Sequence, residues 1–145
     1  MTGVLVLVAT LALATVAGLV MKSREGRVRT TAASTLPTSA LPVPTLPSDV
    51  RAVLAPDGVT LVQLSTTFCA PCRHTRVLLS DLASRTDGLH HAELDLTERP
   101  ELAKQLAVLR TPTTLVVDPS GTEVMRVGGV PKRDQLLAAL RPHLS

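Results

Sequence analysis

Residues 60–84 read TLVQLSTTFCAPCRHTRVLLSDLAS, and this stretch decides the fold. Residues 60–65 predict a short apolar strand, and residues 72–84 predict a helix with Val77, Leu78 and Leu82 on one face. Between them lie the chain's only two cysteines, Cys69 and Cys72. Two cysteines so close together exclude a scaffold held by several disulfides.

Cys69 is expected at the N-terminus of this helix, where unpaired backbone amides and the helix dipole favour a thiolate. Such sites lower the pKa of a cysteine from about 8.5 by one or more units, which makes a nucleophile at neutral pH. Pro71 suits a first helical turn, which has no internal partner for its amide. A purely structural disulfide is a weak alternative, because so short a loop gains only about 2 kcal/mol. Zinc or copper bound by both cysteines and His74 is another alternative, although a closed zinc site needs four ligands. Otherwise His74 is a helix-surface residue near the thiols, with a role in proton transfer as the alternative.

The rest of the chain alternates between strand and helix patterns. Residues 89–96 and 113–118 predict strands, residues 118–121 a turn, and residues 122–127 another strand. Two helices are predicted, one from Pro100 with Leu102, Leu106 and Leu109 on one face, and one over residues 132–144 built on Leu136, Leu137 and Leu140. Two β-α-β crossovers, a hairpin and a terminal helix indicate a mixed sheet covered on both faces. One further strand or helix over residues 50–54 is left unassigned.

The N-terminus predicts an uncleaved transmembrane anchor over residues 1–21. Residues 3–21 form an apolar run of 19 residues, and a helix of that length spans about 28 Å, close to the bilayer core. A buried soluble helix would need a polar face, and a cleaved signal peptide would need basic residues before the run. The basic residues instead follow it, at Lys22, Arg24, Arg27 and Arg29. This favours a single-pass protein of the cell membrane with its domain on the cytoplasmic side, an extracytoplasmic domain being the alternative.

The remaining charge excludes one class of partner. Residues 49–145 contain 11 Lys and Arg and 11 Asp and Glu, so the net charge of +3 comes from the segment after the anchor. A neutral domain argues against a nucleic-acid partner. Residues 22–48 read as a basic juxtamembrane segment and a Pro/Thr/Ser-rich linker, which could hold a domain of residues 49–145 up to roughly 60 Å from the bilayer.

Three motifs together resemble the thioredoxin family: Phe68-Cys69-Ala70-Pro71-Cys72 after a strand, Thr111-Pro112-Thr113, and Val127-Gly128-Gly129 before the last helix. The likeness covers essentially all of residues 49–145. It implies an α/β thioredoxin-like fold, with a central mixed sheet flanked by helices, and a cis bond between Thr111 and Pro112 beside the cysteines. It also implies that the backbone of Thr111 pairs with an extended substrate segment, that Gly128 leaves room in the same groove, and that Phe68 belongs to the rim.

The chemistry implied by this resemblance is thiol–disulfide exchange. Cys69 attacks a substrate disulfide and Cys72 resolves the mixed disulfide, with no cofactor beyond this redox pair and no metal. The expected partners are protein disulfides, the lipid bilayer, and an electron donor such as a thioredoxin reductase or a membrane thiol carrier, and we expect a monomer. A reductase is predicted, while an oxidase or isomerase stays open because the potential is not set by sequence. A copper- or zinc-delivery module on the same scaffold is the alternative from another class.

The sequence departs from the family pattern at three positions. Phe68 stands where the family usually has Trp, Gln63 where it has a buried Asp, and Glu93 where it has the Lys that pairs with that Asp. Proton transfer from Cys72 should then depend on water, or on Glu93 if it lies close enough. We therefore expect a slower or more specialised reductase than a general thioredoxin.

Overall fold

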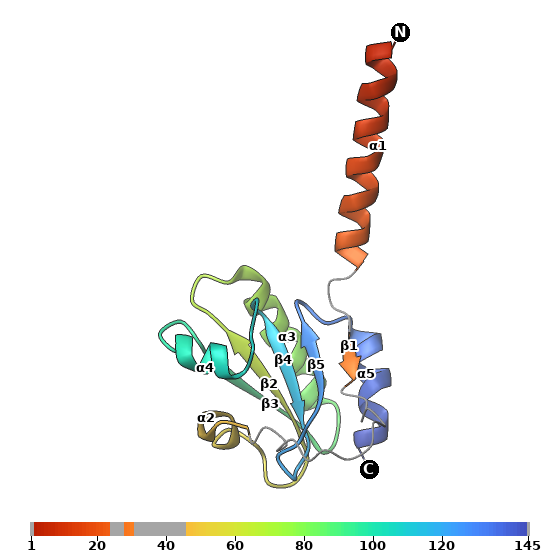
Figure 1. Cartoon of the computed structure of the whole chain (residues 1–145). Helices are drawn as coiled ribbons and strands as arrows, with labels where there is room; N and C mark the ends of the chain where they lie inside the picture. Colours follow the sequence, from red (N-terminus) through yellow and green to blue (C-terminus); the bar gives the residue numbers. More distant parts are fainter. Residues whose placement is uncertain (1, 24–27, 31–45, 145) are drawn as a thin grey trace, which may run out of the picture.

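The computed structural model describes residues 2–23, 28–30 and 46–144 (Figure 1). Its strands and helices alternate through most of the chain. In order they are α1 (Thr2–Ser23), β1 (Val28–Thr30), α2 (Ser48–Arg51), β2 (Val59–Ser65), α3 (Ala70–Ser84), β3 (Leu89–Asp95), α4 (Pro100–Gln105), β4 (Thr113–Val117), β5 (Glu123–Gly128), α5 (Arg133–Leu140) and the 3₁₀ turn η1 (Arg141–His143).

The strands form one mixed sheet in the order β1-β5-β4-β2-β3, which confirms the predicted α/β class. Strand β3 pairs parallel to β2 through the crossover helix α3, whereas β4 and β5 pair antiparallel. The prediction of two β-α-β crossovers is therefore wrong in its second half, because α4 leads to a strand antiparallel to β2. With only six residues, α4 does not carry the chain back to the start of a parallel strand.

The core is aliphatic and lies on both faces of the sheet. Every residue of β2 is buried, so this central strand is covered on both sides. On one face Leu79 and Leu82 of α3 pack with Leu136 and Leu140 of α5. On the other, α2 contributes Val50, α4 contributes Leu102, and Leu106 follows directly after α4. Burying each such side chain contributes about 1.5–3 kcal/mol, which lets the domain fold without an aromatic core.

Two predicted helix faces are corrected by the structure. Helix α3 begins at Ala70, and its buried stripe is Cys72, Thr75, Leu79 and Leu82, so that Val77 is 71% exposed. Helix α4 ends at Gln105, which leaves Leu109 in the following loop and 98% exposed. The expected C-terminal helix is also shorter, since α5 ends at Leu140 and a 3₁₀ turn follows. The unassigned segment forms α2, which begins at Ser48.

Helix α1 is apolar all round. None of the window Gly3–Val20 is buried, which contradicts a soluble core helix for the described residues. The hydroxyls of Thr10 and Thr15 donate to backbone carbonyls of the preceding turn, at 2.9 Å from Leu7 and 2.7 Å from Leu11. By length and composition this helix could cross a membrane, but a signal sequence would meet the same criteria.

Strand β1 was not predicted. It lies within the segment expected to be a basic juxtamembrane region, and it pairs antiparallel with β5 through Val28 and Val127. Most of the predicted linker, residues 31–45, and the basic residues Arg24 and Arg27 lie outside the described residues.

One end of the sheet collects four loops. Strands β2, β3 and β5 end there and β4 begins there, so the loops 66–69, 96–99, 106–112 and 129–132 share this edge, which we call the site edge (Figure 1). A single row of paired residues crosses the sheet just below it: Val28, Val127, Thr114, Gln63 and Glu93.

Candidate active site

The two cysteines lie at the start of α3, on the site edge. Cys69 is the N-cap residue, and its Sγ accepts a hydrogen bond from the backbone N–H of Cys72 at 3.2 Å. Pro71 occupies the first turn, where its missing N–H removes no helical bond. The two sulfurs form a disulfide of 2.00 Å with the Cα atoms 5.2 Å apart. Cys72 is only 2% exposed, whereas Cys69 is half-buried, so Cys69 is the more accessible sulfur.

The loop before Cys69 is hydrogen-bonded to the segment that follows β3. The backbone N–H of Thr67 donates to Oγ1 of Thr97 at 2.7 Å, and the N–H of Thr97 in turn donates to the carboxylate of Asp95 at 2.8 Å. Phe68 follows with φ of 63° and a fully exposed side chain. A bulky residue in the left-handed region is uncommon, and here it turns the chain into the helix. The ring of Phe68 lies on the rim of the site and contributes nothing to the core.

The cis-proline loop lies against this cysteine loop. The Thr111–Pro112 bond is cis, and Oγ1 of Thr111 lies 3.2 Å from Oγ1 of Thr66. The carbonyl of Pro112 accepts from the N–H of Gly129 at 2.7 Å, which fixes the end of β5 beside it. A Cβ on Gly128 would lie 3.2 Å from the guanidinium of Arg110. Thr111, Pro112 and Gly128 therefore lie close to one another, and Thr111 contacts the loop before the cysteines at Thr66.

Beneath Cys72 lies a buried amide. Gln63 is fully buried, and its Nε2 donates to the carbonyl of Cys72 at 2.9 Å. The same Nε2 lies 3.5 Å from Oε1 of Glu93. Glu93 pairs in register with Gln63 across β2 and β3, as the sequence alignment predicted. The Oε1 of Gln63 has no hydrogen-bond partner among the described residues. The site therefore holds a neutral amide directly under the inner cysteine.

Arg76 controls the charge of Glu93. Its Nη2 donates to Oε1 of Glu93 at 2.7 Å, and its Nε donates to Oε2, a two-pronged ion pair. This hydrogen bonding lowers the pKa of Glu93 below the usual range, and burial opposes the shift. The lowered pKa makes the ionised Glu93 a weaker base than an ordinary glutamate.

A pocket of about 420 Å³ opens beside these groups. Cys69, Cys72, Arg73, Arg76 and Glu93 are among the residues on its walls. His74 is exposed on the outer side of α3 and does not line this pocket. Sequence reasoning missed Arg73, Arg76 and Thr97. Arg76 had a signal, because it is one helical turn after Cys72 and its charge complements that of Glu93.

The positions of the residues around the cysteines also test the copper or zinc alternative. Among the described residues, no group of three or more His, Cys, Asp and Glu side chains is placed to hold a metal ion. His74 is not brought to the two sulfurs as a third ligand. His91 is half-buried, with Nδ1 2.9 Å from the hydroxyl of Ser80. Burial lowers the pKa of His91.

Comparison with known proteins agrees with this geometry. Residues 48–142 match the family model described as Thioredoxin. The chain is 34% identical over 88 residues to a thioredoxin of Staphylococcus saprophyticus, which covers 60% of this chain and 84% of the relative. It is 33% identical to thioredoxin H2-2 of Oryza sativa, over 56% of this chain and 59% of that one. Among solved structures, thioredoxin NaTrxh of Nicotiana alata superposes with a TM-score of 0.54 at 25% identity, covering 61% of this chain and 76% of that chain.

Proposed function

We propose a specific role for this chain, which belongs to the thioredoxin family and is a thiol–disulfide oxidoreductase: it reduces protein disulfides while anchored to the cell membrane. The observation that carries the chemistry is the position of Cys69, whose sulfur caps α3 and accepts the N–H of Cys72. Both the N–H and the helix terminus stabilise a thiolate there.

The two cysteines take different roles because their exposure differs. The reduced Cys69 thiolate attacks one sulfur of a substrate disulfide, and the other substrate sulfur leaves as a thiolate. Cys72, nearly inaccessible from outside, then loses its proton and attacks the sulfur of Cys69, which releases the second substrate thiol. The substrate gains two electrons and two protons, and the Cys69–Cys72 disulfide must be reduced again by an electron donor. A thioredoxin reductase or a membrane thiol carrier would supply these electrons.

Deprotonation of Cys72 is the step that sets this chain apart. Gln63 has no proton to exchange, and Glu93 on the same pocket wall is a weak base while Arg76 holds it. Resolution of the mixed disulfide should accordingly be slower than in a protein that has a buried carboxylic acid at position 63. Such a delay suits a reductase specialised for substrates that stay bound to it.

Trapping separates the roles of the two cysteines. The Cys72→Ser variant should accumulate a covalent complex with a disulfide-containing protein under conditions in which Cys69→Ser accumulates none. A dithiol added afterwards should release the complex. Trapping by Cys69→Ser and not by Cys72→Ser would reverse the assignment, and trapping by neither would refute the reductase.

Membrane attachment and sidedness need their own tests. An anchored α1 should keep the full chain in the membrane fraction through alkaline extraction, whereas a cleaved signal sequence would release a shorter protein. A membrane-impermeant thiol reagent should label Cys69 only after cells are lysed, because the basic residues after α1 favour a cytoplasmic domain. Labelling in intact cells would place the domain outside.

A further inference from the structure

The direction of β1 ties α1 to the end of the domain that carries the cysteines. Val28, the first residue of β1, pairs with Val127 near the end of β5, and β1 runs away from the site edge from there. The chain before Val28 therefore leaves the sheet at the site edge. Figure 1 shows α1 beyond the same end of the domain at which β5 ends.

The distance between α1 and the site is limited by covalent geometry. Ser23 ends α1 and Val28 begins β1, so five residue steps separate them, and these extend at most about 18 Å. Across the sheet, β1 and β2 are three strand spacings apart, about 14 Å. Because β1 comes before residues 31–45 in the chain, those residues do not lie between α1 and the sheet.

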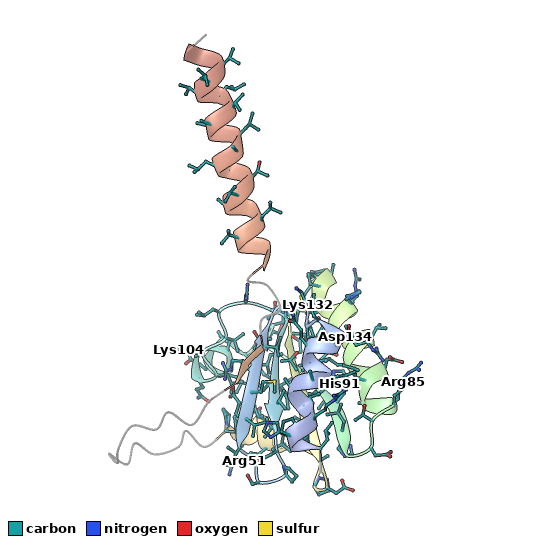
Figure 2. The ribbon with its side chains drawn as sticks, turned by 90° about the vertical axis from the view of Figure 1, so that its right-hand side faces the viewer. Arg51, Arg85, His91, Lys104, Lys132 and Asp134 are labelled. Carbon is teal, nitrogen blue, oxygen red and sulfur yellow. A yellow bond between two sulfur atoms is a disulfide. The ribbon has the colours of Figure 1, made fainter. Side chains whose placement is uncertain are left out.

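Three of the four loops at the site edge suit a membrane face. The loops 66–69, 106–112 and 129–132 contain Arg110 and Lys132 and no Asp or Glu. Phe68 and Leu109, the two most exposed large apolar side chains of residues 46–144, also lie in these loops. Figure 2 shows Lys132 at the end of the domain nearest α1. The acidic residues of the site edge, Asp95 at the end of β3 and Glu98 in the loop after it, lie at the strand farthest from β1.

We infer that β1 holds the site edge toward the bilayer, and that the substrate is a disulfide of an integral membrane protein within about 20 Å of the membrane surface. This inference rests on the proposed membrane-anchored reductase. The exchange is the one described above: Cys69 bonds to one substrate sulfur, the other leaves as a thiolate, and Cys72 completes the two-electron reduction. Basic groups and exposed apolar side chains favour contact with anionic headgroups and the membrane interface.

The test uses the full chain with Cys72→Ser, reconstituted in lipid vesicles with a single-span peptide that carries a disulfide loop. One peptide places the loop about 10 Å above the bilayer, and a second raises it about 50 Å on a rigid helical spacer. The components are mixed at about pH 5, where exchange is slow, and the reaction is started near pH 7.5. The readout is the rate at which the mixed disulfide forms.

Two insertions provide matched controls. A flexible Gly/Ser segment of about twenty residues is placed after Glu25, upstream of β1, or after Ser39, downstream of it. We expect the parent chain to trap the near loop at least about tenfold faster than the far loop. The upstream insertion should bring the two rates within about threefold of each other, and the downstream insertion should leave their ratio unchanged.

The outcomes separate this inference from the proposed function. Equal trapping of both loops by the parent chain, or equal effects of the two insertions, would overturn the inference while leaving the reductase intact. Reduction of a small soluble disulfide by the unsubstituted chain, with a dithiol as electron donor, tests the reductase itself. Release of the chain from the vesicles by alkaline extraction would instead refute the anchor.

Discussion

Replacing Gln63 by Asp introduces a carboxyl group under Cys72, and Asn at the same position is its uncharged counterpart. Both shorter side chains lose the 2.9 Å bond from Nε2 to the carbonyl of Cys72. The carbonyl of Cys72 lies within α3 and keeps its helical donor, so each variant loses one hydrogen bond, about 0.5–1.5 kcal/mol at any pH. The Asp variant adds a carboxylate at a fully buried position that pairs in register with the carboxylate of Glu93.

Burial and the like charge both raise the pKa of such an Asp, by up to about 3–5 units. A rise of about three units corresponds to about 4 kcal/mol. Because the folded pKa then lies above the unfolded value of about 3.9, the Asp variant keeps its stability below about pH 4 and loses it as the pH rises toward about 7. The Asp and Asn variants should thus have similar free energies of unfolding at about pH 4 and differ by about 4 kcal/mol at about pH 7.5.

Urea unfolding of both variants and of the parent chain, across this pH range, measures the difference. An Asp-minus-Asn difference that does not change with pH would refute the dry, unpaired environment assigned to position 63. The rate of disulfide reduction gives a second readout. Only Asp places a titratable base beside Cys72, so its pH–rate profile should move while that of Asn does not. An unmoved profile would show that proton transfer does not limit this enzyme.

Three further substitutions test other parts of the structure. Phe68→Asn should stabilise the fold by up to about 1 kcal/mol in thermal unfolding, because Asn tolerates the left-handed backbone and the lost ring is fully exposed. In the parent chain, Arg76 lowers the pKa of Glu93, and the stability this contributes is lost as the pH falls through that lowered pKa. Arg76→Gln should therefore lose less stability than the parent chain as the pH falls below the ordinary carboxyl range. An equal slope of the free energy of unfolding against pH would contradict this. Leu79→Ala should cost about 2–5 kcal/mol in urea unfolding and Val77→Ala less than about 0.5, and equal costs would contradict the observed face of α3.

The sequence was sufficient for the centre of the site. A CxxC pair between a strand and a helix, followed by Thr-Pro before another strand, has few alternatives, because each part depends on local backbone chemistry. The alignment of Glu93 beside Gln63 could also be predicted, since β2 and β3 are consecutive parallel strands joined by one helix. The cis bond at Pro112 followed from the resemblance.

Other features depend on tertiary packing. Val77 and Leu79 differ by two positions in a helix with apolar residues on several sides, and only the sheet beneath α3 decides which is buried. The spacing and charge of Arg76 make it a candidate partner of Glu93, but the rotation of α3 against β3, which decides the pairing, depends on packing. Strand β1 has only three residues and is held through backbone pairing at a sheet edge, which any side-chain pattern permits.

The exposed ring of Phe68, next to a disulfide in a chain with no Trp and no Tyr, has a spectroscopic consequence. Without those residues the oxidised protein has almost no absorbance or fluorescence of its own in the near ultraviolet. A Phe68→Trp chain would therefore contain a single fluorophore, placed beside the redox-active sulfurs. Because a disulfide quenches a neighbouring indole, its emission should rise when Cys69 and Cys72 are reduced, and each turnover could be followed in a membrane sample without any external label.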